Sequence, residues 1–265
     1  MSTPPLRPRL PIAALLLAAA AAVLFCLPLL GLVLRAPWGS FWDELRAPDV
    51  RIALRLSLIC SLSATALSMV LGLPLAWVQA RLVFPGRAWL RGLTLLPIVL
   101  PPVVGGVALL TAFGRRGLLG RWLDAAFGLS LPFTTPGAVL AETFVAMPFF
   151  VLTMEGAFAA ADRRLEDAAR TLGAGPWRVF RQVTLPLTRP SLIAGAVLCW
   201  ARALGEFGAT ITFAGNFPGR TQTVPLAVYL LLESRPQAGI ALSLVLVAVS
   251  LVVLVMLRDR WMRML

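Results

Sequence analysis

The sequence predicts an all-α integral membrane protein with six transmembrane helices. Hydrophobic residues make up 59% of the 265 residues and charged residues 14%, a balance far from that of soluble domains. A helix needs about 20 apolar residues to cross the hydrocarbon core of a bilayer. Six stretches meet that requirement: residues 11–34, 53–80, 92–113, 137–160, 191–214 and 238–257.

The composition excludes several kinds of chemistry. All 24 basic residues are Arg, and the sequence has neither Lys nor His. Without Lys there is no P-loop nucleotide site and no Schiff base, and without His there is no Ser-His pair and no histidine metal ligand. The three cysteines are far apart in apolar stretches, so they indicate neither a disulfide framework nor a metal site. Because long apolar stretches accompany the net charge of +12, this charge indicates a membrane surface and not nucleic acid.

The Arg distribution predicts the orientation. The first stretch follows Arg7 and Arg9, as a signal peptide would, but its 24 residues exceed the apolar region of one. We therefore expect a retained span. With the N-terminus inside, the inner segments carry 14 Arg and the outer loops 8, which favours two cytoplasmic termini. The expected organisation is a first span with an outer loop (1–52), a core of five spans (53–257) and a cytoplasmic tail (258–265).

The third stretch cannot form a regular helix. Proline lacks an amide donor and clashes with the preceding turn, so a helix across 92–113 must be kinked or broken. Two interpretations stay open: a proline-kinked packing helix, or a broken helix that lines a pathway. The residues concerned are Pro97, Pro101, Pro102, Gly105 and Gly106.

The longest inner loop, residues 161–190, predicts two short helices. Asp162 is suited to cap the first helix and Gly173 to end it. Pro176 suits the first turn of the second helix, which we expect Leu185-Pro186 to end. The loop is either a connector resting on the inner ends of the spans or a docking device. The apolar stripe of its first helix consists of Leu165, Ala168, Ala169 and Leu172.

The same loop resembles the signature of type I ABC-importer permeases. That signature reads Glu-Ala-Ala, three residues, Gly, nine residues, Ile, one residue, Leu-Pro. Here it is Asp167-Ala168-Ala169, Gly173, Val183 and Leu185-Pro186, with every interval kept and Glu166 adding a carboxylate one position earlier. The resemblance implies that the loop docks on a separate cytoplasmic ATPase, which binds ATP and Mg²⁺. The chain itself would hold no cofactor and no metal and would not be an enzyme. The residues implied in coupling are Glu166, Asp167, Ala168, Ala169, Gly173, Leu185 and Pro186.

A second region resembles the molybdate branch of these permeases, with sulfate and tungstate permeases as near relatives. The matching runs are 201–210 and 215–221, together with 84–86, 100–104 and 114–117. The resemblance implies a homodimer in the bacterial inner membrane, surrounded by lipid, with two ATPase subunits and an extracytoplasmic molybdate-binding protein. Sulfate, thiosulfate or tungstate transport is the alternative.

Charged residues inside the fifth stretch need partners. Arg202 and Glu206 are four residues apart and share one helix face. They form either a self-neutralising structural pair or part of an anion pathway. Gly205 and Gly208 allow either close helix approach or a helix break. The residues expected along the pathway are Pro101, Pro102, Arg202, Gly205, Glu206, Phe207, Gly208 and Thr210.

Two rival functions explain less of the sequence. A secondary transporter with broken helices predicts an internal repeat, which we do not find, and leaves the loop 161–190 unexplained. An aspartyl intramembrane enzyme needs two carboxylates at mid-membrane in a recognisable setting. Glu142 and Glu155 lie near the ends of the fourth stretch, where we expect them to be interfacial or paired.

We expect residues 215–237 to form an ordered outer loop.

Overall fold

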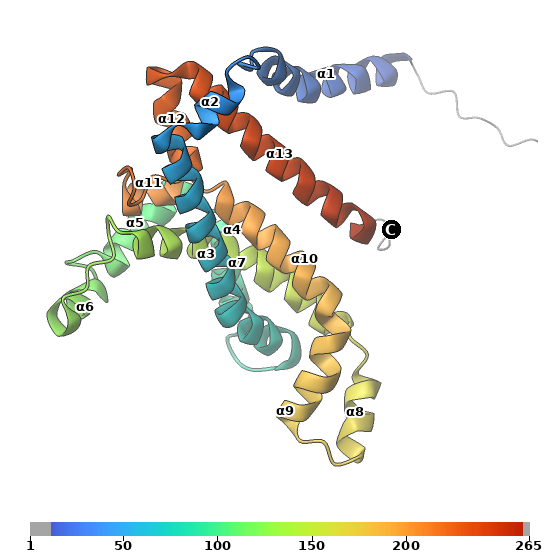
Figure 1. Ribbon diagram of the computed structural model, residues 1–265. Helices are drawn as coiled ribbons and strands as arrows, with labels where there is room; N and C mark the ends of the chain where they lie inside the picture. Colours follow the sequence, from blue (N-terminus) through green and yellow to red (C-terminus); the bar gives the residue numbers. More distant parts are fainter. Residues whose placement is uncertain (1–11, 262–265) are drawn as a thin grey trace, which may run out of the picture.

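The computed structural model describes residues 12–261, with side chains as far as Leu257. This part of the chain is built of helices and contains no strand (Figure 1). The predictions that involve Arg7, Arg9 and the side chains of 258–265 lie outside the residues described. Within the described range, five helical stretches are long and apolar enough to cross a membrane: α1 (Ile12–Leu34), α3 (Pro48–Arg81), α7 (Thr135–Ala160), Pro176–Leu204 and Pro236–Leu257 of α13 (Pro236–Trp261).

The predicted third span is two helices. α4 (Arg87–Val99) and α5 (Pro102–Phe113) are separated by Leu100 and Pro101, both in extended conformations. A residue that precedes proline is disfavoured in the helical region, and two such residues follow one another here. The prediction that a helix across 92–113 is kinked or broken is confirmed, and of the two the structure shows a break.

The predicted fifth span is also divided. α10 (Leu185–Leu204) ends before Gly205, and α11 (Gly208–Ala214) begins after a break of three residues. The expectation of one helix across 191–214 is therefore wrong. Averaged hydropathy does not detect this break, because the apolar residues around it outweigh Glu206 and Arg202.

At its other end α10 is longer than predicted. It continues from α9 (Pro176–Val179) through a π-helical turn, η1 (Phe180–Thr184), in which the Leu185 N–H donates to the Phe180 carbonyl oxygen. In a regular α-helix the Pro186 ring would clash with the carbonyl four residues earlier. The wider π turn accommodates the proline. The expectation that Leu185-Pro186 ends a helix is therefore wrong, since they lie inside a continuous helical stretch.

α7 is the centre of the packing. It lies along α3 and α10, and the three helices share the largest buried cluster (Figure 1). The cluster places large side chains of α7 against small residues of its neighbours, which lets the backbones approach closely. Its buried members are Ala64, Ala76, Ala146, Phe150, Val151, Met154, Phe158, Cys199 and Ala203.

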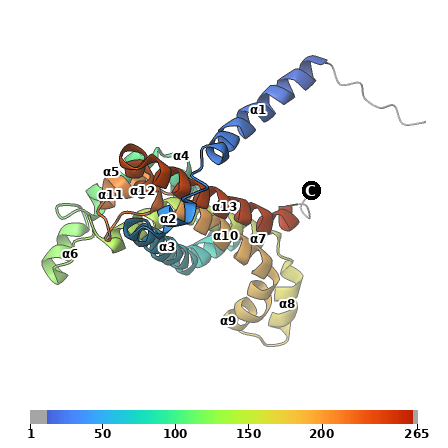
Figure 2. The same cartoon turned by 45° about the horizontal axis from the view of Figure 1, so that its top comes forward.

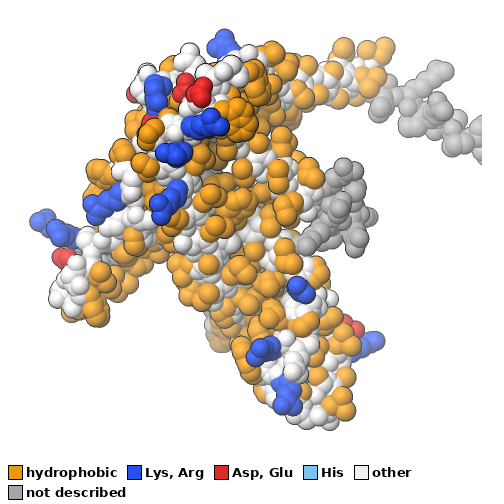
Figure 3. Space-filling model, viewed as in Figure 1, with side chains coloured by type: hydrophobic (Ala, Val, Ile, Leu, Met, Phe, Trp, Pro, Cys, Tyr) orange, Lys and Arg blue, Asp and Glu red, His pale blue; other side chains and the backbone are white. Residues whose placement is uncertain are grey.

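α1 stands away from this bundle in both views (Figures 1 and 2), and none of its residues is buried. In Figure 1 the shorter helices α2 (Phe41–Arg46) and α12 (Val224–Ser234) lie at the end of the molecule opposite α8 (Arg163–Thr171), and α6 (Gly120–Phe127) projects to the left. α12 occupies much of the segment 215–237 that was expected to be a loop. On the face drawn in Figure 3, charged side chains gather toward the two ends, with a mainly hydrophobic surface between them.

Candidate functional site

The loop 161–190 forms a helical hairpin that projects from one end of the molecule (Figure 1). Asp162 caps α8, because its Oδ1 accepts a hydrogen bond of 2.9 Å from the Arg164 N–H. Gly173 ends α8 with a φ of +82°, and the Ala174 N–H donates to the Ala169 carbonyl oxygen at 3.0 Å. Helices commonly end in this way, with a glycine at positive φ and a hydrogen bond back to a carbonyl of the last turn. Both predicted ends of α8 are confirmed.

The burial of α8 is the reverse of what its apolar stripe predicts. Leu172 is 89% exposed and Leu165 is 48% exposed, whereas the charged Glu166 is 6% exposed. Of the two interpretations of the loop, the connector whose apolar stripe rests on the inner ends of the spans therefore does not fit. An apolar surface that its own chain leaves uncovered indicates a contact with another molecule.

Two neighbouring carboxylates have different surroundings. Glu166 faces the membrane-spanning helices, and its Oε1 accepts hydrogen bonds from Arg81 Nη2 at 2.7 Å and Thr184 Oγ1 at 2.9 Å. The Asp167 side chain is 65% exposed and pairs with Arg170 of the same helix at 2.9 Å. Of the two acidic residues predicted to act in coupling, only Asp167 is available to a partner protein.

Aromatic rings fix the base of the hairpin. The Phe180 ring lies 6.4 Å from that of Trp77 on α3 and 6.3 Å from that of Phe158 on α7, measured between centroids. Trp177 stacks on Phe180 at 5.8 Å and is itself 71% exposed. The hairpin is thus anchored on one side and presents a large apolar ring on the other. Leu185 and Pro186 lie farther along the chain, where they shape η1.

The second predicted site lies where α5 and α11 meet. A Cβ added at Gly208 would lie 2.6 Å from the Pro102 Cβ, a distance that real contacts do not show. A Cβ added at Gly205 would have the Ala201 carbonyl oxygen as its nearest neighbour, at 3.7 Å. The structure therefore distinguishes the roles of two glycines, which the sequence could not do. Gly208 allows the close approach of α11 to α5, and Gly205 lies in the break. Pro102, which follows Pro101, packs against Gly208.

Arg202 and Glu206 form the predicted pair, at 2.7 Å between Nη2 and Oε2. The other oxygen of Glu206 accepts a hydrogen bond of 2.9 Å from the Ala209 N–H, so this carboxylate bridges the break. Glu206 and Thr210 are buried, Phe207 packs on the Tyr229 ring at 5.6 Å, and the Arg202 side chain is 29% exposed. Among these residues, Arg202 is the partly exposed cation, so it is the one that can contact an anion.

The other buried carboxylates were predicted in part. Glu155 pairs with Arg91 of α4 at 3.1 Å, as the expectation of a paired residue requires. Glu142 is buried within α7. Arg81 and Thr184 were not predicted as partners of Glu166, and the position of Arg81 at the inner end of an apolar stretch was the available signal.

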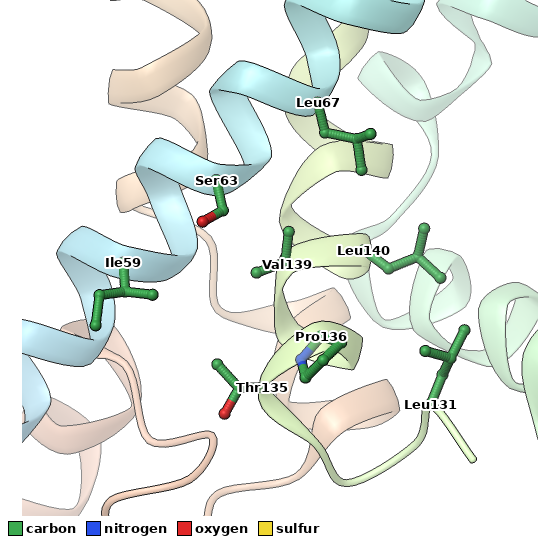
Figure 4. A pocket seen from close by; sticks show the side chains of 8 residues that line it. All are labelled: Ile59, Ser63, Leu67, Leu131, Thr135, Pro136, Val139 and Leu140. Carbon is green, nitrogen blue, oxygen red and sulfur yellow. The ribbon is translucent and has the colours of Figure 1, made fainter. Parts of the chain in front are cut away.

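A cavity of about 520 Å³ lies between α3 and the start of α7 (Figure 4). The side chains shown there are mostly aliphatic, with hydroxyl groups from Ser63 and Thr135 and no charged group. Such a lining does not offer a site to an anion. The break near Arg202 is therefore the better candidate for substrate contact.

The chain belongs to the family of binding-protein-dependent transport system inner membrane components, whose pattern matches residues 50–265. It is 48% identical to the molybdenum transport system permease protein ModB of Mycobacterium tuberculosis over 236 residues, 89% of each chain. It is 45% identical to ModB of Escherichia coli K12, over 79% of this chain and 92% of that protein. It is 36% identical to the sulfate transport system permease protein CysT of E. coli K12, over 88% of this chain and 85% of that protein.

A solved structure shows the same fold. A bacterial ABC transporter involved in the import of the acidic polysaccharide alginate superposes with a TM-score of 0.71 over 95% of both chains, at 18% identity. The predicted all-α permease fold is confirmed.

Proposed function

We propose that this chain is the membrane-spanning subunit of an ATP-driven importer that carries molybdate across the bacterial inner membrane. The observation that supports the substrate most is the identity of 48% and 45% to molybdenum permeases, against 36% to a sulfate permease. Tungstate and sulfate or thiosulfate are the competing substrates.

The exposed surface of the hairpin supports a soluble partner. Leu172 and Trp177 are large apolar side chains that are mostly exposed on their own chain, and Trp is a frequent anchor at protein interfaces. A chain without Lys has no P-loop lysine of its own. We infer that two cytoplasmic ATPase subunits receive the hairpins and bind ATP and Mg²⁺, while this chain performs no catalysis.

The continuous helix Pro176–Leu204 supports mechanical coupling. Its 29 residues extend from the hairpin to the break before α11. At 1.5 Å per residue the helix is about 43 Å long, enough to connect a cytoplasmic contact with the interior of the membrane. A displacement of the hairpin by the closing ATPases would thus reach the Arg202–Glu206 pair directly.

Arg202 suits transient contact with a dianion. Its charge is balanced by Glu206 at 2.7 Å, and its side chain is partly exposed. An anion would meet a cation that is already paired, which favours weak passing contacts over tight binding. This role extends to the neighbouring residues Pro101, Pro102, Gly205, Phe207, Gly208 and Thr210.

The assembly we propose is a homodimer with both termini in the cytoplasm. One chain forms half of a pathway, and two-fold symmetry supplies the other half. The 23 residues of α1, none of them buried, leave a long apolar surface for lipid or a second copy. The excess of Arg on the hairpin side supports the orientation, which leaves the opposite side to a molybdate-binding protein.

Complementation tests the proposal. In a bacterium that lacks its own molybdate permease, this chain is expressed with its ATPase and binding protein. We expect molybdoenzyme activity to return at low external molybdate and to be lost when the P-loop lysine of the ATPase is replaced. No activity, with this chain and the ATPase present in the membrane fraction and the binding protein expressed, would contradict the proposal.

A further inference from the structure

We infer that Glu166 is a positioning residue that fastens α8 to α3, so that hairpin movement enters the membrane through two helices instead of one. This inference rests on the proposed function. It concerns how this chain transmits the movement, and not which face the ATPase contacts.

One carboxylate oxygen joins three elements. Oε1 of Glu166 on α8 accepts hydrogen bonds from Arg81, the last residue of α3, and from Thr184, the last residue of η1. The distances are 2.7 Å and 2.9 Å. We call these three residues the Glu166 clasp. Arg81 and Glu166 are 85 positions apart, so the clasp connects segments that the local chain does not hold together.

The clasp is buried, unlike the Arg170 side chain of α8, which pairs with Asp167 at 2.9 Å and with the other Glu166 oxygen at 3.8 Å. Its Arg81 and Glu166 side chains are 6% and 8% exposed, against 55% and 65% for Arg170 and Asp167. Exposed pairs contribute little and are screened by salt, whereas a buried cation that loses its partner is strongly disfavoured. Nε and Nη1 of Arg81 are buried and have no hydrogen-bond partner among the described residues. The guanidinium therefore depends on Glu166.

α8 has few other connections to the membrane helices. Its apolar stripe is exposed, and it packs chiefly on α9 and η1, which lead into α10. A push on the hairpin reaches α10 along the chain. It reaches α3 through the clasp, and α3 lies along α7. Without the clasp, α8 would have no ion pair to α3, and hairpin movement would reach α3 and α7 only through the Phe180 ring contacts and the packing of α10, so the pathway would open incompletely.

The test measures molybdate uptake per ATP hydrolysed in vesicles that contain the complete complex. Glu166→Ala removes the clasp, and Glu166→Gln keeps an oxygen that can accept both hydrogen bonds. Asp49→Asn is the matched control, because Asp49 also lies on α3 and pairs with an Arg, Arg235, but both side chains are exposed. The double variant Arg81→Leu with Glu166→Leu replaces the buried pair by apolar contact, an exchange that proteins often tolerate.

We expect uptake per ATP to fall at least tenfold in Glu166→Ala, less in Glu166→Gln, and not at all in Asp49→Asn. The double leucine variant should recover most of the lost uptake per ATP. If the charge of Glu166 itself were required, this recovery would not occur. All variants should retain the ATPase during purification.

An unchanged ratio in Glu166→Ala would overturn the inference. Loss of ATPase binding in Glu166→Gln would overturn it as well, because it would place Glu166 in the docking contact. These outcomes differ from a failure of the proposed function, in which the wild-type complex itself would show no ATP-dependent molybdate uptake.

Discussion

Gly208→Ala is the substitution whose effect follows most directly from the packing of the break. The new Cβ would lie 2.6 Å from the Pro102 Cβ, whereas carbon atoms in favourable contact are about 3.5–4.0 Å apart. A proline ring cannot turn away, so α11 must move from α5 by about 1 Å. Overpacking of this kind costs about 1–3 kcal/mol.

Thermal unfolding of the purified protein in detergent measures this cost. For a chain of this size, 1 kcal/mol corresponds to about 2–4 °C, so we expect an apparent Tm lower by about 2–12 °C. Gly205→Ala is the neighbouring control, because its Cβ would meet nothing closer than 3.7 Å and its φ of −90° suits any residue. Equal Tm values for wild type and both variants would refute the packing argument.

Three further variants test the hairpin and the pathway. Gly173→Val forces a β-branched residue to φ +82°, which costs about 1–2 kcal/mol, and should reduce the ATPase recovered by co-purification; full recovery would contradict the turn argument. Trp177→Ala should weaken ATPase binding about tenfold or more in a titration, while loss of its stacking on Phe180 should lower the Tm of the isolated chain by only about 1–6 °C; unaltered affinity would remove Trp177 from the contact. Arg202→Gln with Glu206→Gln should preserve assembly but slow molybdate uptake, and unchanged kinetics would make the pair purely structural.

Hydropathy and local signals predicted much of the fold. The long spans follow from the length of apolar stretches, and the ends of α8 follow from Asp162 and Gly173, whose effects are local. The break at Leu100 and Pro101 was predictable for the same reason, since proline acts on its immediate neighbours. α12 was missed because its 11 residues are too short to register as a span.

The side of α8 that is buried could not be predicted. Sequence patterns assign the apolar face of a helix to the core, and this rule fails where that face serves another molecule. Glu166 illustrates the difficulty, because its partner Arg81 is 85 residues away and no periodicity connects them. The different roles of Gly205 and Gly208 likewise depend on where Pro102 lies in space.

The central claim is tested most directly by uptake of labelled molybdate into vesicles. The ATPase is enclosed in the vesicles, the binding protein is outside, and excess unlabelled sulfate is the competitor. We predict uptake that requires internal ATP and the binding protein and that resists the sulfate. Sulfate transport without molybdate uptake would contradict the proposed substrate, and uptake without ATP would contradict the coupled importer itself.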